Sequence, residues 1–199
     1  MRYSTAAFAV VLSVAACGVP ATSAPARSPS GPSARVQRID AAPGMVVRRA
    51  CTPTGPEVCF DARDDNCNGI IDEGCGVRTG LVQFAIAWDE PTTDVDLHVI
   101  DPNGELVEPG RLTASGLTKD RDCPGPREDC QGQNLENVFL EEGKELPRGR
   151  YRVRIRLEKL GDVEPPVRCT FGARVGPKSY AVELELQRVE EEGEIVFEL

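Results

Sequence analysis

The sequence predicts an all-β fold: an antiparallel β-sandwich, preceded by a small disulfide-rich calcium-loop module and a disordered N-terminal tether. Three observations lead to this prediction. From residue 76 onward, apolar and polar residues alternate with period two, which is typical of half-buried strands. Turn signals containing Gly and Pro separate the alternating runs. Four cysteines recur every eight residues just before these runs.

The alternating runs define the expected strands and their inward faces. They cover residues 82–88, 95–99, 151–157, 167–175, 180–186 and 195–199, with an apolar residue at nearly every second position. Turn signals fall at residues 102–104, 147–149 and 175–177. No helical periodicity competes, so we expect residues 76–199 to form a sandwich of seven or eight short strands.

Charged residues occupy the expected outer faces of two runs. Arginines stand at alternate positions over residues 150–156, and Glu183 and Glu185 alternate in a later run. If those strands are neighbours, we expect the opposite charges to pair across them and to leave a charge-balanced face. The alternative is a basic stripe that binds an acidic glycan.

Composition narrows the function classes. The chain has 199 residues, 5% aromatic residues, a formal net charge of −9 and a pI near 4.8. This size and composition suit one modest core. An acidic balance argues against nucleic acid as a partner, because phosphate binding needs a basic face. No apolar run reaches the length of about 18 residues that a membrane-spanning helix needs.

The first 17 residues have the design of an export leader. Arg2 supplies a positive start, and residues 6–16 are apolar except for Ser13. The segment ends in Val14-Ala15-Ala16-Cys17, which resembles the bacterial lipobox, whose cysteine receives diacylglycerol before cleavage. The resemblance implies a signal peptide over residues 1–16 and a membrane anchor at Cys17. The alternative is ordinary cleavage nearby, which would release a soluble secreted protein.

Residues 17–50 are predicted to be a lipidated flexible tether. They are rich in Ala, Pro, Ser and Gly and show no strand or helix pattern. Gly18, rather than Asp, follows the lipidated cysteine, which favours the outer membrane or cell surface. The charged residues are five arginines and one aspartate. We interpret them as part of a solvated spacer, the alternative being contact with anionic lipid head groups or surface glycans.

Residues 51–75 form a Cys-rich acidic module. Cys51, Cys59, Cys67 and Cys75 lie in it, and six acidic residues stand against one arginine. A segment this short has almost no core, so disulfides, a metal or both must hold it together. Four cysteines allow three pairings, and the spacing leaves all three open.

Within this module, residues 64–73 follow the front of an EF-hand calcium loop, with Asp64 as position 1 and Gly69 as the turn glycine at position 6. The predicted metal ligands are Asp64, Asn66, Asn68, Ile70 through its carbonyl, and Asp72, with Glu73 as a candidate for a further oxygen. Cys75 stands at position 12, where the loop usually has a bidentate Glu. We therefore expect Ca²⁺ to bind more weakly than in a sensor loop.

The string from Glu57 to Cys75 resembles a short metal-binding motif that is repeated in surface proteins of myxobacteria and occurs in a copper-binding surface protein of a methanotroph. The resemblance supports a metal but leaves its identity open. Oxygen ligands favour Ca²⁺ as the cofactor. The alternatives are a purely structural acidic disulfide loop and a soft-metal site. The eight-residue spacing differs from the closely spaced cysteine pairs of zinc folds.

Carboxylates in the sandwich form a second candidate metal site. Its residues are Asp94, Asp96, Asp101, Asp122 and Glu136. The alternative is that these side chains shape turns and cap backbone groups. His98, the only histidine, is expected to be a hydrogen-bonded strand residue rather than a general base or a metal ligand.

The remaining cysteines of the sandwich are odd in number. Cys123 and Cys130 are seven residues apart in a loop rich in Pro and Gly, and we expect them to pair. Cys169 lies on an inward face, where a free thiol behaves as a small apolar residue. The alternative is that Cys169 pins the loop and leaves one of the other two unpaired.

Four segments carry a family resemblance. Ala87-Trp88, DVDLHVIDPNGE at 94–105, LENV at 135–138 and PRGRYRV at 147–153 are similar, in order and spacing, to the YfaP-like domain of unknown function. The resemblance covers about residues 80–199. It implies a secreted or envelope β-sandwich that is often joined to other modules, without implying a catalytic activity.

These observations predict a non-enzymatic lipoprotein of the bacterial cell envelope that binds or adheres through its sandwich and carries Ca²⁺. The expected partners are the membrane and a surface glycan or envelope protein. The alternatives are an accessory module that tethers polysaccharide or a secreted hydrolase at the surface, copper acquisition, and an enzyme that depends on His98.

Overall fold

The computed structural model describes residues 35–48, 51–124, 130 and 132–199. The predicted signal peptide, Cys17 and residues 18–34 of the predicted tether lie outside the described residues. The regular elements of the described part are ten β-strands, which confirms the all-β prediction. No helix in this part is long and apolar enough to cross a membrane.

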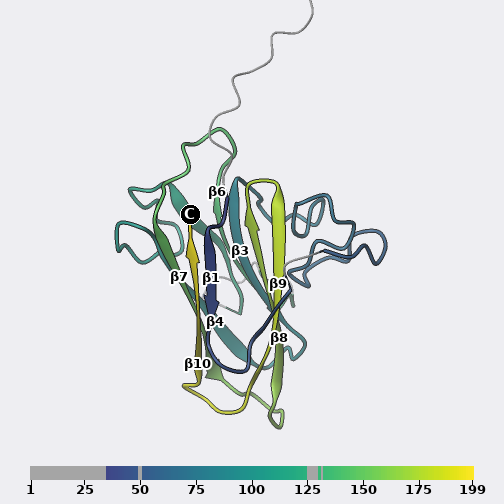
Figure 1. Cartoon of the computed structure of the whole chain (residues 1–199). Helices are drawn as coiled ribbons and strands as arrows, with labels where there is room; N and C mark the ends of the chain where they lie inside the picture. Colours follow the sequence, from purple (N-terminus) through teal and green to yellow (C-terminus); the bar gives the residue numbers. More distant parts are fainter. Residues whose placement is uncertain (1–34, 49–50, 125–129, 131) are drawn as a thin grey trace, which may run out of the picture. The chain divides into compact units, whose positions relative to one another are not determined.

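The strands form two antiparallel sheets that pack face to face as a sandwich (Figure 1). One sheet has four strands in the order β1-β10-β7-β4, and the other has six in the order β2-β9-β8-β3-β6-β5. The strands are β1 (Arg38–Ala41), β2 (Val46–Arg48), β3 (Val82–Trp88), β4 (Asp94–Ile100), β5 (Leu117–Asp122), β6 (Leu135–Leu140), β7 (Arg150–Lys159), β8 (Val167–Val175), β9 (Lys178–Leu186) and β10 (Glu192–Glu198).

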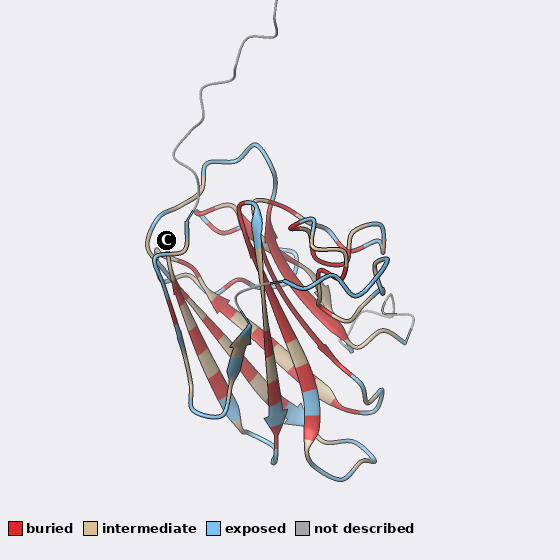
Figure 2. Cartoon of the chain, turned by 45° about the vertical axis from the view of Figure 1, so that its right-hand side comes forward, coloured by how far each residue is buried: buried red, intermediate tan, exposed pale blue. Residues whose placement is uncertain are grey.

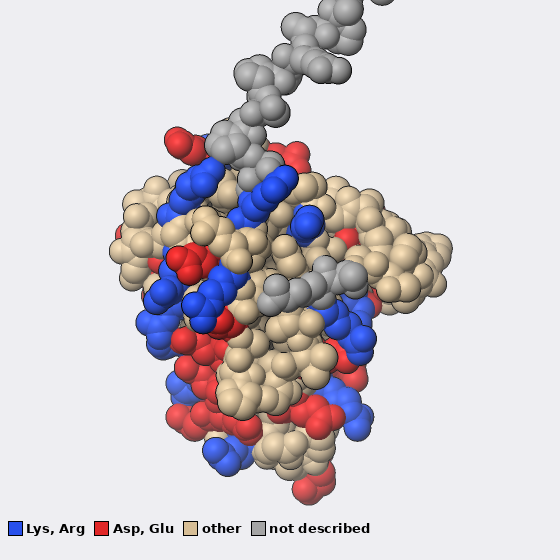
Figure 3. Space-filling model, in the orientation of Figure 1, with Lys and Arg blue, Asp and Glu red and all other residues tan. Residues whose placement is uncertain are grey.

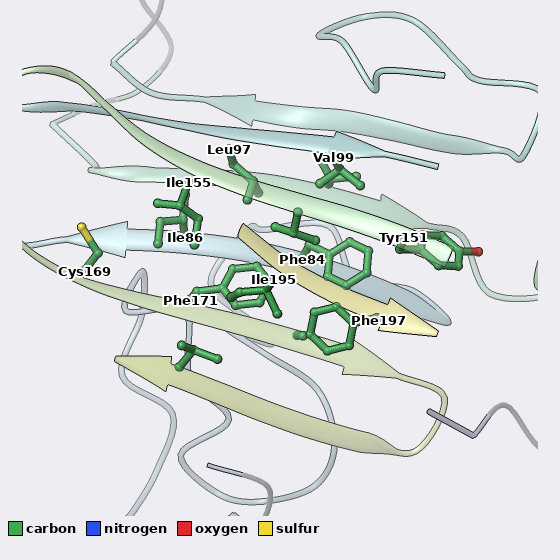
Figure 4. Packing of buried hydrophobic residues seen from close by; sticks show 14 of the residues in the cluster. Phe84, Ile86, Leu97, Val99, Tyr151, Ile155, Cys169, Phe171, Ile195 and Phe197 are labelled. Carbon is green, nitrogen blue, oxygen red and sulfur yellow. The ribbon is translucent and has the colours of Figure 1, made fainter. Parts of the chain in front are cut away.

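The core lies between the two sheets, where aromatic rings from both layers meet (Figure 4). The ring of Phe84 in β3 lies 5.9 Å from that of Tyr151 in β7 and 5.4 Å from that of Phe197 in β10, between centroids. Phe171 of β8 lies 6.2 Å from Phe84. The Tyr151 hydroxyl donates to the Pro147 carbonyl at 2.6 Å, so its polar end is satisfied at the edge of the core.

Residues 38–48 belong to the sandwich, so the prediction of a flexible tether up to residue 50 is wrong for this segment. β1 pairs with β10 in one sheet and β2 pairs with β9 in the other. Ile39 is buried in the core, and Met45 packs where Gly193 leaves room for it. The segment therefore closes one side of the sandwich. Strands of four and three residues are too short to show an alternation in the sequence.

The described part of residues 76–199 forms eight strands, β3 to β10, which confirms the prediction of seven or eight strands. Two of them, β5 and β6, show no alternating run in the sequence. All six residues of β6 are buried, including the polar pair Glu136 and Asn137, so no apolar–polar alternation appears. β5 is polar, and its pairing with β6 shifts register between Lys119 and Arg121. The buried polar side chains of β6 are paired with polar side chains of the neighbouring strands β5 and β3, so β6 has no apolar–polar alternation in its sequence.

The Cys-rich module docks on the outer face of the six-stranded sheet. Its residues Ala62 and Ile71 form a second small core with Ala85, Ala87, Val77 and Leu135. β3 is consequently covered on both faces, and all seven of its residues are buried (Figure 2). Gly172 of β8 permits the close approach, because a Cβ there would overlap the carbonyl oxygen of Ala62.

The outer face of the four-stranded sheet is charge-balanced, with positive and negative side chains interspersed (Figure 3). Its ion partners differ from those predicted. Arg152 and Arg154 of β7 contact Glu194 of β10 at 2.9 and 3.0 Å. Glu183 and Glu185 belong to β9 in the other sheet. β7 and β9 lie in different layers, so the condition for the expected pairing of the β7 arginines with these two glutamates is not met.

Candidate functional site

Two disulfides brace the module. Cys51 bonds to Cys67, and Cys59 bonds to Cys75, so the first cysteine pairs with the third and the second with the fourth. Of the three pairings that the sequence left open, this one links two overlapping loops. The four sulfur atoms are consumed as disulfides and do not supply the thiolates that a Cys₄ zinc site needs.

Asp64, the first residue of the predicted calcium loop, caps backbone groups. Its carboxylate accepts hydrogen bonds from the backbone N–H groups of Asn68 at 3.0 Å and Gly69 at 2.9 Å. It also accepts one from the Ser179 hydroxyl of β9 at 2.6 Å. Asp64 therefore holds the loop turn together and fastens the module to the sheet.

Asp72, the predicted ligand at loop position 9, is fully buried. Its carboxylate accepts hydrogen bonds from the backbone N–H groups of Phe60 at 2.6 Å, Asp61 at 3.3 Å and Ala62 at 3.2 Å. Burial raises its pKa to about 6, and the charge of Asp61 adds to this effect. The side chain thus organises residues 60–62.

Glu73 gathers the two asparagines of the loop around its carboxylate. Asn66 donates through Nδ2 to Glu73 Oε1 at 2.6 Å and to Glu57 Oε2 at 2.9 Å. Asn68 also donates through Nδ2 to Glu73 Oε1. Burial, together with the nearby charge of Glu73, raises the pKa of Glu57 to about 7. Glu57 was not a predicted site residue. The signal that could have indicated it is its place at the start of the motif string, two residues before Cys59.

The predicted calcium ligands are only partly brought together. Asn66, Asn68 and Glu73 meet, with Glu57 in addition, whereas Asp72 is directed elsewhere and Asp64 is occupied by backbone donors. The Ile70 N–H donates to Asn68 Oδ1 at 2.9 Å, which engages that oxygen as well. Within the described residues, no group of three or more His, Cys, Asp or Glu side chains is placed to hold a metal ion. The predicted ligands do not all converge on one point in the described structure, and calcium binding stays a prediction.

In the sandwich, a lysine occupies the centre of the second predicted metal site. Lys119 Nζ of β5 lies 2.7 Å from Glu136 Oε2 and 2.5 Å from Asp122 Oδ1. Burial raises the pKa of Glu136 well above its usual value, against the opposing charge of Lys119. Burial alone would lower the pKa of Lys119, but Glu136 and Asp122 outweigh it and raise that pKa. The ammonium neutralises this pair in place of a metal ion.

Of the other predicted ligands of this site, Asp94 is close enough to Asp122 and Lys119 for their charges to act on it, whereas Asp101 and Asp96 have other partners. Asp101 caps the turn after β4 by accepting hydrogen bonds from the Asn103 and Glu105 N–H groups. Asp96 faces His98, with 3.9 Å between Oδ2 and Nε2. Asp94 has a buried Oδ1 without a hydrogen-bond partner in the described structure. Burial raises its pKa to about 6, and the charge of Asp96 adds to this effect.

The cysteines of the sandwich are placed as predicted. Cys123 bonds to Cys130, and Cys169 is a buried free thiol. Burial, together with the charge of Asp89, raises the pKa of Cys169 to about 12. A thiol with such a pKa is a poor nucleophile at neutral pH.

A groove of about 820 Å³ lies where the module meets the end of the sheet, and we call it the module groove. Phe60 and Arg63 of the module, Arg168 and Thr170 of β8, and Glu183 and Glu185 of β9 line it. Arg63 Nη2 donates to Thr170 Oγ1 at 3.1 Å and to Glu183 Oε1 at 3.3 Å. Arg168 Nε donates to Glu185 Oε1 at 3.4 Å. Sequence reasoning missed this groove, because its walls come from five separate segments of the chain.

No protein-family profile matches this chain, and neither a curated protein nor a solved structure matches it. The resemblances to the YfaP-like domain and to the metal-binding motif therefore stay predictions from the sequence.

Proposed function

We propose that this chain is a lipid-anchored, non-enzymatic binding protein of the bacterial cell envelope, and that the module groove is its binding site. The groove carries the proposal. Its volume falls within the roughly 300–1,000 Å³ of ordinary ligand sites, and its walls combine an aromatic ring with fixed donors and acceptors. The leader that ends in Cys17 supports the envelope location.

The ionisable groups of the groove favour binding over catalysis. Arg63 pairs with Glu183 and Arg168 pairs with Glu185, which fixes these side chains in structural ion pairs. Cys169 borders the groove, but its raised pKa keeps it a neutral thiol. His98 lies in β4 of the other sheet and does not line the groove. Hydrolysis of generic ester, peptide or glycoside substrates that His98→Ala abolishes would overturn this part of the proposal.

Lipid anchoring is tested by metabolic labelling with a radioactive fatty acid. The wild-type chain should incorporate the label and partition into detergent, whereas a Cys17→Ser variant should do neither. Gly18→Ala is the matched control, because it changes the next residue and keeps the cysteine. A wild-type chain that stays unlabelled and soluble would contradict the anchor and would leave the groove as a separate question.

Calcium is not required by this proposal, because hydrogen bonds and disulfides already hold the module. Its binding is tested by calorimetric titration of the Cys17→Ser chain, beside an Asp64→Ala/Asp72→Ala double variant and Glu73→Gln. Binding that is lost only with Glu73→Gln would place the ion at Glu57 and Glu73. Binding that all three chains share would place it in the sandwich. No binding would leave the module as a structural element alone.

Two alternative functions, an accessory tethering protein and copper acquisition, are supported to different degrees. An accessory protein that holds a polysaccharide or a secreted hydrolase at the surface would use the same groove and anchor. Copper acquisition has less support, because six of the eight cysteines are in disulfides and Cys169 is buried. Tight copper binding that survives removal of calcium would reinstate it.

A further inference from the structure

Phe60 adopts a backbone conformation that a bulky side chain rarely takes. Its φ of +68° lies in the left-handed region, where glycine and asparagine are favoured and an aromatic residue is an outlier. Two neighbours hold it there: Asp72 accepts its N–H at 2.6 Å, and Cys59 next to it is tied to Cys75. The turn itself would therefore form more easily with asparagine at this position.

The ring of Phe60 lies at the boundary between the small core under the module and the module groove. It packs only partly against the small core under the module, and it lines the module groove. Residues kept in sparsely populated conformations concentrate at binding and catalytic sites, where the side chain is needed in that position. Ala62, Cys67 and Asp72 of the module also adopt positive φ, so the position of the ring in the groove is what indicates its functional role.

The charges of the groove narrow the ligand class. Its walls hold two arginines against four carboxylates, those of Asp61, Asp89, Glu183 and Glu185, so a polyanion is repelled. A purely apolar ligand would strip water from the charged walls and give no hydrogen bonds in return. A polyhydroxylated, uncharged chain is not repelled by the carboxylates, and it offers hydrogen bonds to the charged walls. Its hydroxyl groups accept from guanidinium and donate to carboxylate, and its C–H faces pack on an aromatic ring.

The rim of the groove is open. Arg168 and Glu185 are 72% and 53% exposed, so a long chain can run past them. We infer that the module groove binds a neutral polysaccharide, with Phe60 as the stacking platform and the Arg168–Glu185 pair as the polar clamp. This inference rests on the proposed function as an envelope binding protein and names its ligand class.

The test is affinity electrophoresis of the full chain carrying Cys17→Ser, in gels that contain dextran, a soluble β-1,3-glucan or galactomannan. Polygalacturonate gels and competition with hexalysine cover the polyanionic and cationic alternatives. At least one neutral polysaccharide should retard the chain. Phe60→Asn should weaken that binding about tenfold while its thermal midpoint stays equal or rises. Phe60→Tyr should keep the binding within about twofold, because the ring remains.

Val58→Ala is the matched control, because Val58 is an exposed residue of the same module outside the groove. If Phe60→Asn fails to fold, Arg168→Ala decides, since that exposed side chain has no part in the core. Binding by none of the neutral polysaccharides, or binding that Phe60→Asn and Arg168→Ala leave unchanged, overturns the inference. Binding of hexalysine or polygalacturonate alone also overturns it. The Cys17→Ser chain lacks the anchor, so these outcomes are independent of lipidation.

Discussion

The carboxylate of Glu136 in β6 accepts a hydrogen bond of 2.6 Å from the backbone N–H of Leu97 in β4, which joins the two sheets. β4 is an outer strand of its sheet, and a buried side chain of the opposite sheet satisfies this edge N–H. Lys119 contacts the same carboxylate oxygen at 2.7 Å. The edge of the sandwich is therefore closed by a polar network rather than by another strand.

Replacing Lys119 should expose how much this network depends on the lysine. Lys119→Met leaves Glu136 buried without its counter-ion, and such a loss typically costs about 3–5 kcal/mol of the free energy of unfolding. Urea denaturation measures the effect. The Lys119→Met/Glu136→Gln double variant should recover part of it, because no charge is then left in the interior. Equal stability of Lys119→Met and wild type would contradict this account.

Ile39 tests whether residues 38–48 belong to the sandwich. Its side chain is 7% exposed and packs in the main core, so Ile39→Ala should lower the free energy of unfolding by about 2–4 kcal/mol. Val46→Ala, at a side chain that is 58% exposed in the same segment, is the control and should change it by less than about 0.5 kcal/mol. If both variants were as stable as wild type, the segment would behave as a tether after all.

The module can dock closely on the sheet because Gly172 has no Cβ. Gly172→Ala places a Cβ against the carbonyl oxygen of Ala62, and such overpacking costs typically about 1–3 kcal/mol. We expect residues 51–75 to become accessible to protease before the sandwich unfolds. Limited proteolysis with mass spectrometry checks this, with Arg168→Ala in the same strand as the control. A module that stays protected would show that the contact yields without undocking.

Stability should fall, not rise, as the pH increases from 5 to 7.5. Glu57 has a pKa raised to about 7 and Asp94 one raised to about 6, so the folded state holds protons that the unfolded state has released. Each group then lowers the free energy of unfolding as the pH rises through its folded-state pKa. Glu183 and Glu194 have lowered pKa values, so their contribution is lost only at more acidic pH.

Thermal unfolding across this pH range gives the slope directly. Glu57→Gln and Asp94→Asn should each flatten it, and the double variant should flatten it further, because each substitution removes one carboxylate with a raised pKa. Part of the slope should remain, because Asp72 also has a raised pKa. A wild-type midpoint that rises steadily toward pH 7.5 would mean that neither pKa is raised in the folded protein.

Thiol titration should find one reactive cysteine, and only after unfolding. In the Cys17→Ser chain the six disulfide cysteines do not react, and Cys169 is buried with a pKa near 12. Ellman's reagent should therefore detect about zero thiols in the native protein and about one in guanidinium chloride. Cys169→Ala should remove that signal. A rapid native reaction would place Cys169 at the surface of the groove.

The sequence by itself determined the all-β class and the inward faces of six strands, and it favoured the pairing of Cys123 with Cys130 beside a free Cys169, which the structure confirms. These features follow from local patterns, because one buried face per strand leaves a period of two and a short loop brings two cysteines together. It also located the module, from its cysteine spacing and acidic charge.

Only the tertiary structure decided what the acidic residues do. Asp64 and Asp72 match a calcium loop by spacing, yet their carboxylates turn to backbone N–H groups that the disulfides bring near. Lys119 neutralises Glu136 because the register of the paired strands β5 and β6 makes them diagonal neighbours. Arginines of β7 meet β10 rather than β9, since a strand's neighbours are set by how the two sheets assemble, and no local pattern records that choice.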